Sequence, residues 1–176
     1  MDGTASLVYL MAAFDSKAKP INKNYQQTLG AITRGNKAEK KIALVFTGDE
    51  FADGGNSINQ TLKANKTKAS FFFTGRFYRN PKFNQLIKSL KANGNYLGPH
   101  SNEHLLYNDW TKRDSLLVSH ATFTTDLTAN YETMAQVGIT KKEAHYFLPP
   151  YEWHNQSIAN WTNEFGLQLV NFTSGT

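Results

Sequence analysis

Residues 42–74 read IALVFTGDEFADGGNSINQTLKANKTKASFFFT, and this stretch decides the fold. It begins and ends with a short apolar run, at 42–47 and at 69–74, and polar residues or glycine bound each run, as they bound buried strands. Between the two runs, apolar side chains one helical turn apart predict a helix over about 56–66. A strand, a helix and a second strand in this order are typical of a parallel α/β sheet.

The same alternation continues toward residue 172. Further strands are predicted at 95–98, 144–148 and 167–172, and further helices at 80–93, 111–137 and 155–165. These strands are too few for a complete (β/α)8 barrel, which usually takes about 250 residues. We therefore predict an α/β fold with about five parallel strands, as an open sheet or as an incomplete barrel.

Residues 1–40 follow a different pattern. The apolar stretch 7–14 predicts a short packed helix, and the polar stretch 20–41, which is rich in Asn, Gln and Lys, predicts a loop with one helical turn. We therefore divide the chain into an N-terminal extension, 1–40, that packs on the domain, and a single domain, 41–176.

The composition excludes several classes of function. The 176 residues carry a net charge of +5, but the lysines are scattered and form no basic stripe, so nucleic-acid binding is not expected. No cysteine is present, which excludes a thiolate zinc site and a cysteine nucleophile. No apolar run approaches the roughly 18 residues of a membrane span.

Polar clusters follow three of the predicted strands. Asp49 and Glu50 come after the first strand, His100 and His104 after the third, and a Pro-Pro-Tyr segment, 149–151, after the fourth. Functional residues gather where the carboxyl ends of parallel strands meet. Two histidines four residues apart share one helical face, and with a carboxylate they make a usual ligand set of catalytic zinc. Taken alone, each cluster has an ordinary alternative: a solvated acidic turn, unrelated surface histidines or a rigid loop.

The three clusters, in this order, resemble the motifs of the polysaccharide deacetylase family, the NodB-homology domain of carbohydrate esterase family 4. The family has Thr-Phe-Asp-Asp-Gly after its first strand, and TGDEF at 47–51 would fill this motif. Its second motif, His-Ser/Thr-x-x-His, matches HSNEH at 100–104 in full, and its third matches LPPY at 148–151 in part. The stretch KASFFFTG at 68–75 is also similar to a family strand, and the resemblance covers about 41–176.

This resemblance implies a distorted (β/α) barrel whose C-terminal part has no counterpart in these residues. It also implies the metal-dependent removal of N- or O-acetyl groups from a carbohydrate polymer, with release of acetate. Asp49 would be the general base, and the backbone N–H of Tyr151 would stabilise the oxyanion. Glu50, His100 and His104 would hold a divalent metal. This ligand set favours Zn²⁺, and Co²⁺ or Ni²⁺ would fit the same donors.

The resemblance also indicates which substrate is bound and where. The partner would be an acetylated poly- or oligosaccharide outside the cytoplasm, since such enzymes act on exported polymers. Pro150 and Tyr151 would line the sugar site, together with three aromatic rings near the motifs, Tyr107, Trp110 and Trp153. Ordinary packing of amphipathic rings is the alternative for these three residues.

Several residues depart from the family pattern. Glu50 stands where Asp is usual, Asp53 offers a rival register for the ligand or the base, and Leu148 stands where an arginine normally pairs with the catalytic aspartate. The late Leu-x-His motif, which supplies the general acid, has no counterpart before residue 176. His154 is the histidine held in reserve for the site, and a complementing C-terminal segment on a separate chain would supply the acid.

Two other functions remain open at this point. HSNEH also spells the inverted zinc-protease motif H-x-x-E-H, with Glu103 as the base, but that motif needs a long helix and a further acidic ligand. Leu148 and the missing acid favour the second alternative, a glycan-binding module without catalysis on a deacetylase fold.

Overall fold

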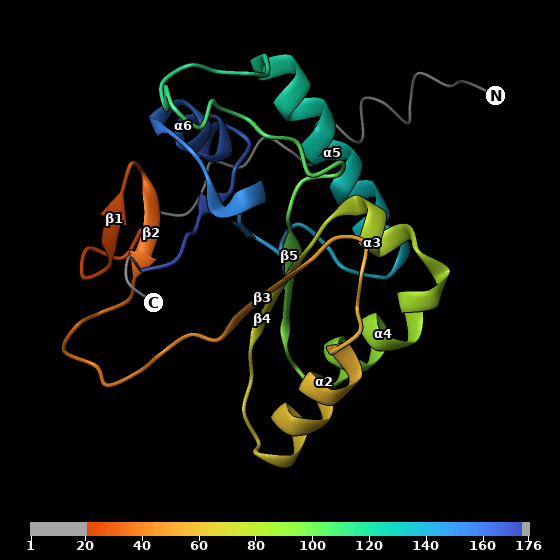
Figure 1. Cartoon of the computed structure of the whole chain (residues 1–176). Coiled ribbons are helices and arrows are strands. Elements are labelled where there is room, and N and C mark those ends of the chain that lie inside the picture. The colour runs from red at the N-terminus through yellow and green to blue at the C-terminus, as the bar shows by residue number, and fades with distance from the viewer. Residues whose placement is uncertain (1–20, 174–176) are drawn as a thin grey trace.

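A three-stranded parallel sheet forms the centre of the computed structural model, which describes residues 21–173 (Figure 1). Its strands are β3 (Val45–Gly48), β4 (Ser70–Phe73) and β5 (Tyr96–Pro99), with β4 in the middle. The register pairs Gly48 with Phe73 and Phe73 with Pro99, so the three strands end at the same level. The loops that follow these strands therefore meet at one edge of the sheet.

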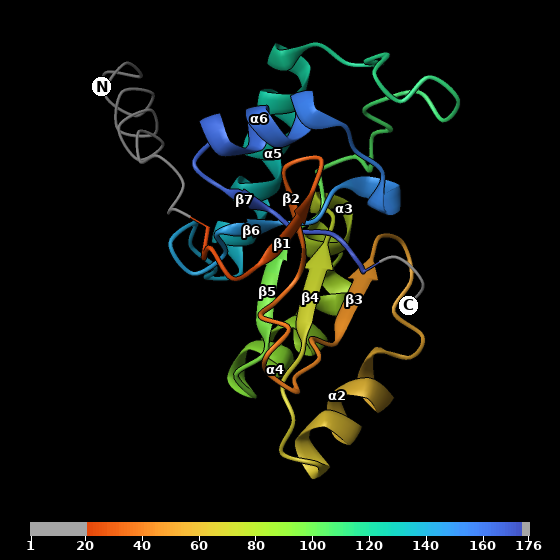
Figure 2. The ribbon, with the colours of Figure 1, turned by 90° about the vertical axis from the view of Figure 1, so that its left-hand side faces the viewer.

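Helices connect these strands and cover one face of the sheet. The connections contain α2 (Gly55–Ala64), α3 (Gly75–Arg79), the 3-10 turn η1 (Pro81–Phe83) and α4 (Asn84–Ala92). Figure 2 shows α4 behind the strands. Leu86, Ile87 and Leu90 of α4 are buried, and their spacing places them on one apolar stripe against the sheet. The helices expected near 56–66 and 80–93 are confirmed, whereas α3 was not predicted.

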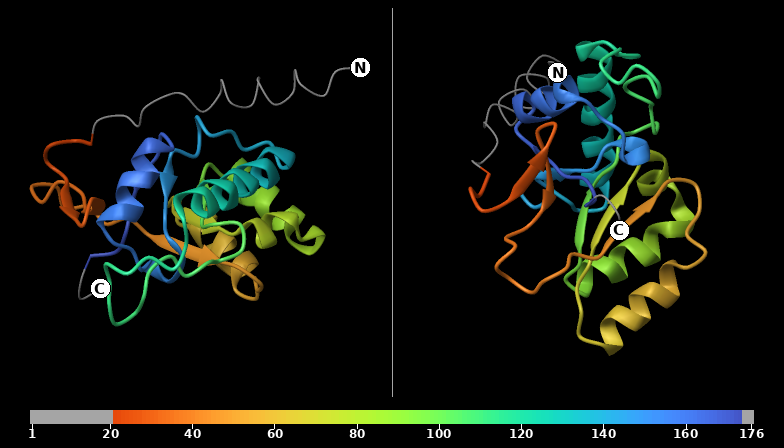
Figure 3. Two further views of the ribbon diagram at one scale, coloured as in Figure 1. Left: turned by 90° about the horizontal axis from the view of Figure 1, so that it is seen from above. Right: turned by 60° about the vertical axis from the view of Figure 1, so that its left-hand side comes forward.

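The second half of the chain extends the row of strands. It contains α5 (His120–Gln136), β6 (Tyr146–Phe147), the 3-10 turn η2 (Pro150–Glu152), α6 (Gln156–Glu164) and β7 (Gln168–Leu169). β6 pairs with β7 in parallel, and Leu148 N donates to Pro99 O at 3.4 Å, which joins β6 to the end of β5. Helices α5 and α6 lie side by side (Figure 3), with the rings of Phe123 and Trp161 5.8 Å apart. The expected α/β fold with about five parallel strands is confirmed.

A hairpin replaces the loop expected over 20–41. β1 (Gln26–Thr28) and β2 (Ala31–Arg34) pair in antiparallel fashion, and Leu29 and Gly30 form the turn with φ of 48° and 78°. Two consecutive positive φ angles are the geometry of a tight hairpin turn. The polar composition of this stretch did not indicate such a turn. A parallel bridge between Ile32 and Val170 places β2 beside β7. The helix expected at 7–14 lies outside the described residues.

Strand β3 is more exposed than its apolar sequence predicts. The run 42–47 was expected to be a buried strand, but Ile42 is 89% and Val45 48% exposed. The reason is topological, because β3 is the edge strand of its sheet and no strand within residues 21–173 pairs with its outer side. Apolar periodicity indicates which residues can be buried, and the topology decides which of them are.

The long helix expected over 111–137 begins later than predicted. Asp109 Oδ1 accepts hydrogen bonds from the backbone N–H of Thr111 and of Lys112, which holds this stretch in a turn. Ser119 then caps α5 by accepting from Thr122 N at 3.0 Å. In the part of the chain that the structure describes, no helix has the length and apolar character needed to cross a membrane.

Candidate active site

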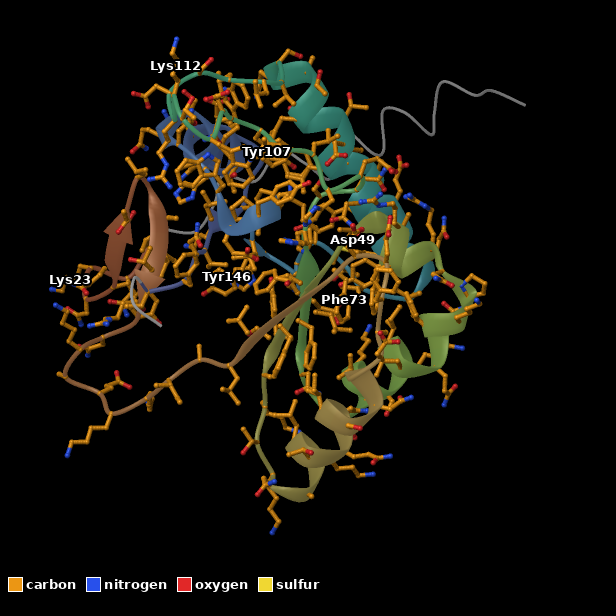
Figure 4. The ribbon with its side chains drawn as sticks, viewed as in Figure 1. Lys23, Asp49, Phe73, Tyr107, Lys112 and Tyr146 are labelled. Atoms are coloured by element: carbon orange, nitrogen blue, oxygen red, sulfur yellow. The ribbon has the colours of Figure 1, made fainter. Side chains whose placement is uncertain are left out.

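The carboxylates of the site follow β3 directly. Asp49 lies at the carboxyl end of the sheet (Figure 4), and its Oδ1 accepts from Thr74 Oγ1 at 2.8 Å and from Arg76 Nε at 3.0 Å. Arg76 Nη2 donates to Oδ2 of the same carboxylate at 2.6 Å, and Nη1 donates to Glu50 Oε1 at 3.4 Å. Arg76 was not among the predicted site residues. Its only signal in the sequence is its place just after a predicted strand.

The two histidines of the HSNEH motif converge through their ring nitrogens. His100 follows β5 and is 2% exposed, and its Nδ1 lies 2.8 Å from Leu148 O. A carbonyl can only accept, so Nδ1 carries the proton and Nε2 presents a lone pair. His104 Nε2 lies 3.3 Å from His100 Nε2. Two imidazoles that bind one tetrahedral zinc ion hold their nitrogens about 3.3 Å apart, so this pair fits half of a metal site.

The motif lies in a loop and not on a helix, which corrects the expectation of a shared helical face. Ser101 and His104 have φ of 72° and 54°, which no α-helix contains. Asp126 of α5 shapes this loop, because it accepts from Ser101 Oγ at 2.7 Å, Asn102 N at 2.9 Å and Glu103 N at 3.1 Å. The geometry therefore removes the long helix that the zinc-protease interpretation requires.

Both histidines are held in the neutral form. Burial lowers the pKa of His100 to about 4, and the neighbouring His104 adds to this shift, while the hydrogen bond to Leu148 opposes it. Burial also lowers the pKa of His104, and the charge of Asp49 opposes the shift. Near pH 7 both rings are thus neutral, with one nitrogen free to bind a metal ion.

The histidine pair and the two carboxylates line one open pocket of about 240 Å³. Its lining consists of Thr47, Gly48, Asp49, Glu50, Phe51, His100 and His104. Within residues 21–173, no three His, Asp or Glu side chains converge closely enough to form a complete metal site. The histidine pair fits a divalent ion, whereas the carboxylates of Asp49 and Glu50 are bound to Arg76.

A row of aromatic rings begins beside His104, with Tyr151 of the Pro-Pro-Tyr loop. Tyr151 has a φ of 60°, and its ring centroid lies 4.4 Å from that of His104 and 5.4 Å from that of Trp110. Trp153 continues the group 5.5 Å from Trp110, and Arg113 lies 3.6 Å over its ring. Trp110 is 51% and Tyr151 44% exposed, so both residues are open to solvent.

Two residues expected to line the sugar site lie in the interior. Tyr107 is 1% exposed, packs on Phe123 and directs its hydroxyl toward Asp126 at 3.4 Å. Its amphipathic ring therefore serves the core, which was the alternative interpretation, and not a sugar cleft. Pro150 is buried as well.

The residues held in reserve lie away from the histidine pair. Asp53 lines a neighbouring, mostly apolar pocket with Phe46 and Ile58. His154 is 3% exposed, and its ring nitrogens contact Thr28 O at 3.4 Å and Asn171 Nδ2 at 2.9 Å. His154 thus packs beneath the β1–β2 hairpin.

Comparisons with solved structures place the fold among carbohydrate esterases. A family 4 carbohydrate esterase from Bacillus anthracis is 27% identical, with a TM-score of 0.70 over 82% of this chain and 65% of that one. A mutant of a family 4 pseudoenzyme with restored enzymatic activity is 19% identical, with a TM-score of 0.68 over 82% and 48%. A chitin deacetylase from the fungal pathogen Colletotrichum lindemuthianum is 19% identical, with a TM-score of 0.62 over 73% and 54%. This chain thus spans about half to two thirds of the length of the structures it matches.

The comparison of sequences agrees with that of structures. None of the curated proteins searched is similar enough to count as a match. The family model for polysaccharide deacetylases matches residues 34–170, which include all three motifs and most of the chain. The protein therefore belongs to the polysaccharide deacetylase family.

Proposed function

We propose that this domain hydrolyses N- or O-acetyl groups of a carbohydrate polymer and releases acetate. The observation that carries the proposal is the convergence of His100 and His104, with Nε2 atoms 3.3 Å apart, in the pocket that Asp49 and Glu50 also line. Membership of the polysaccharide deacetylase family supports the same reaction. The neutral state of both histidines suits them as ligands at the pH of most biological fluids.

A divalent metal would be held by His100, His104 and Glu50. Zn²⁺ suits two imidazoles and one carboxylate best, and Co²⁺ or Ni²⁺ would accept the same donors. When bound, the ion would supply Lewis-acid polarisation of the acetyl carbonyl. The lowered pKa of His100 and its fixed Nδ1 proton prepare this side of the site before any ion arrives.

The protein groups supply the proton transfer and the binding. Asp49 takes the proton of the attacking water, and the backbone N–H of Tyr151 donates to the oxyanion of the tetrahedral intermediate. The bond from the carbonyl carbon to the sugar nitrogen or oxygen then breaks, and a proton must reach that leaving atom. We propose that an acid on a complementing segment supplies this proton.

The sugar chain would lie across the aromatic rings of Tyr151, Trp110 and Trp153. The ring of Tyr151 lies beside His104, which lines the pocket, and the other two rings continue from it. Trp110 and Tyr151 each expose close to half of their surface. Aromatic faces provide broad apolar surface with a polar edge, which suits the faces of sugar rings. A polymer of this kind is met outside the cytoplasm, where we place the protein.

A glycan-binding module without turnover is the second candidate. One observation favours it: the carboxylates of Asp49 and Glu50 are bound to Arg76, and among the described residues no three His, Asp or Glu side chains converge on one metal position. In that case the aromatic rings would bind the oligosaccharide, and no acetate would be released.

Acetate release from N-acetylglucosamine oligomers, measured on this chain together with the complementing segment and with added Zn²⁺ or Co²⁺, separates these functions. We expect release by the wild type and none by Asp49→Asn, whereas the exposed Asp114→Asn remains active. Loss in Asp53→Asn in place of Asp49→Asn would establish the rival register. Oligomer binding without release would establish the glycan-binding module and refute hydrolysis.

A further inference from the structure

We propose that Arg76 is the residue that positions the carboxylates of this site, in place of the arginine that the family carries at the position of Leu148. The inference rests on the proposed deacetylation and adds a residue to its machinery. Leu148 in the sequence leaves Asp49 without its usual cationic partner, and the contact with Arg76 in the structure provides another.

The guanidinium of Arg76 lies across both carboxylates. Its Nε and Nη2 bind the two oxygens of Asp49 at 3.0 and 2.6 Å, and its Nη1 reaches Glu50 at 3.4 Å. A planar fork holds a carboxylate in one orientation, whereas an ammonium group acts as a point charge and leaves the carboxylate free to turn. Arg76 thus sets the rotation of Asp49 as well as compensating its charge.

The backbone of Arg76 is fixed to the histidine loop. Gly75 N donates to Ser101 O at 3.0 Å, and Arg76 N donates to Asn102 O at 3.3 Å. A Cβ at Gly75 would lie 1.9 Å from Asn102 Oδ1 and 2.8 Å from Arg79 Nη1, so these two side chains would have to move if Gly75 were replaced. Through these contacts, Arg76 ties the carboxylate loop to the loop that carries His100 and His104.

Position 148 serves the site through its backbone alone. Leu148 is 3% exposed, and its carbonyl oxygen accepts from His100 Nδ1 at 2.8 Å. A leucine side chain offers no donor to Asp49. The side chain of Thr74 is the other donor to Asp49, and this hydroxyl is neutral. Among the described residues that hydrogen-bond to Asp49, Arg76 is therefore the cationic one.

The test compares Arg76→Lys with Arg79→Lys. Arg79 lies on the same helix but binds Glu103 and Asn102, which do not line the pocket. We expect Arg76→Lys to lower kcat about 10–100-fold, as the loss of a supporting partner does, with KM changed by less than about twofold. Arg79→Lys should stay within about threefold of the wild type in both constants. If Arg76 had only a structural role, Arg76→Lys would lower the urea midpoint of unfolding. It would not lower kcat while leaving KM unchanged.

Two further measurements test the role of Arg76 without relying on the Arg76→Lys variant. The double variant Arg76→Leu with Leu148→Arg returns the arginine to the family position, and we expect it to recover at least tenfold over Arg76→Leu alone. In the metal-free protein, the Arg76 Nε–H signal in an ¹H–¹⁵N spectrum should shift in Asp49→Asn and stay in place in Asp114→Asn. This signal reports the contact without any turnover.

The possible failures are distinguishable. An active wild type whose Arg76→Lys and Arg79→Lys variants have equal kcat overturns the role of Arg76 and leaves the proposed function standing. An Arg76 signal that ignores Asp49→Asn overturns the contact itself. A wild type that releases no acetate when the complementing segment is present refutes the proposed function, and the role of Arg76 in that reaction falls with it.

Discussion

His100 is 2% exposed, whereas Glu50, on the other side of the same pocket, leaves 58% of its side chain exposed. The histidine side is held from several directions, because Asp126 accepts three hydrogen bonds from the loop and Leu148 orients the imidazole. The carboxylate side follows an edge strand and depends on Thr74 and Arg76.

This difference separates stability from function within one site. Buried hydrogen bonds to a charged group contribute to folding, and their loss leaves unsatisfied donors in the interior. Exposed ion pairs contribute little to stability, although they can orient a group that must react. We therefore expect changes on the histidine side to lower both stability and activity, and changes on the carboxylate side to lower activity alone.

The largest effect is expected from His100→Gln, which removes one of the two converging nitrogens. If this pair holds the metal, the variant loses several kcal/mol of Lewis-acid stabilisation, or at least about 1,000-fold in acetate release. Titration with Co²⁺, followed by its visible absorption, should show binding by the wild type and none by the variant. His120→Gln, at the exposed start of α5, is the matched control and should bind Co²⁺ normally. Equal Co²⁺ affinity in His100→Gln would remove the histidine pair from the metal site.

The second effect is expected from Asp126→Asn, which weakens the support of the histidine loop. One amide oxygen cannot replace a carboxylate that accepts from Ser101, Asn102 and Glu103, and we expect a loss of about 3 kcal/mol in the free energy of unfolding. Urea unfolding measures this change. Glu132→Gln, an exposed residue of the same helix, should unfold as the wild type does. If both variants unfold at the same urea concentration, Asp126 does not hold the loop.

The third effect concerns acid. The folded pKa of His100, about 4, lies below the unfolded value of 6.5, so the unfolded chain binds the extra proton between these two values. The stability contributed by the neutral ring is thus present above pH 6.5 and declines as the pH falls toward 4. From pH 7 to pH 5 we expect a loss of about 2 kcal/mol from this residue in metal-free protein. Urea unfolding at both pH values should show a smaller decline in His100→Gln than in His120→Gln.

The order of elements and the histidine motif could be predicted because they depend on local patterns. Apolar runs of strand length indicate the parallel strands, and the spacing of the two histidines in HSNEH is typical of metal ligands. The hairpin at 26–34 escaped prediction because its strands are short and polar and its turn begins with Leu29. The late start of α5 depends on the Asx turn at Asp109, which competes with helix formation.

Arg76 could not be predicted from such patterns. It lies 27 residues after Asp49, and only the parallel register of β3 with β4, which places Gly48 beside Phe73, brings the two together. Leu148 indicated that a cation was missing from its usual place, but the sequence contains no signal of what replaces it. The burial of Tyr107 could not be predicted either. Tyr107 and Trp110 are only three residues apart in the chain, yet Tyr107 is buried and Trp110 is exposed.

The smallest effect is expected on the stability of Arg76→Lys, and it is the sharpest test of the comparison. The side chains of Arg76 and Asp49 are 35% and 26% exposed, so solvent screens their ion pair. Such pairs contribute about 0–1 kcal/mol, and lysine retains the charge, so the urea midpoint should stay within the range of Arg79→Lys. The same variant is expected to lose most of its kcat. If Arg76→Lys instead unfolds as early as Asp126→Asn, then Arg76 supports the fold as Asp126 does. A fall in kcat would then report lost structure, and the two sides of the pocket would not differ in kind.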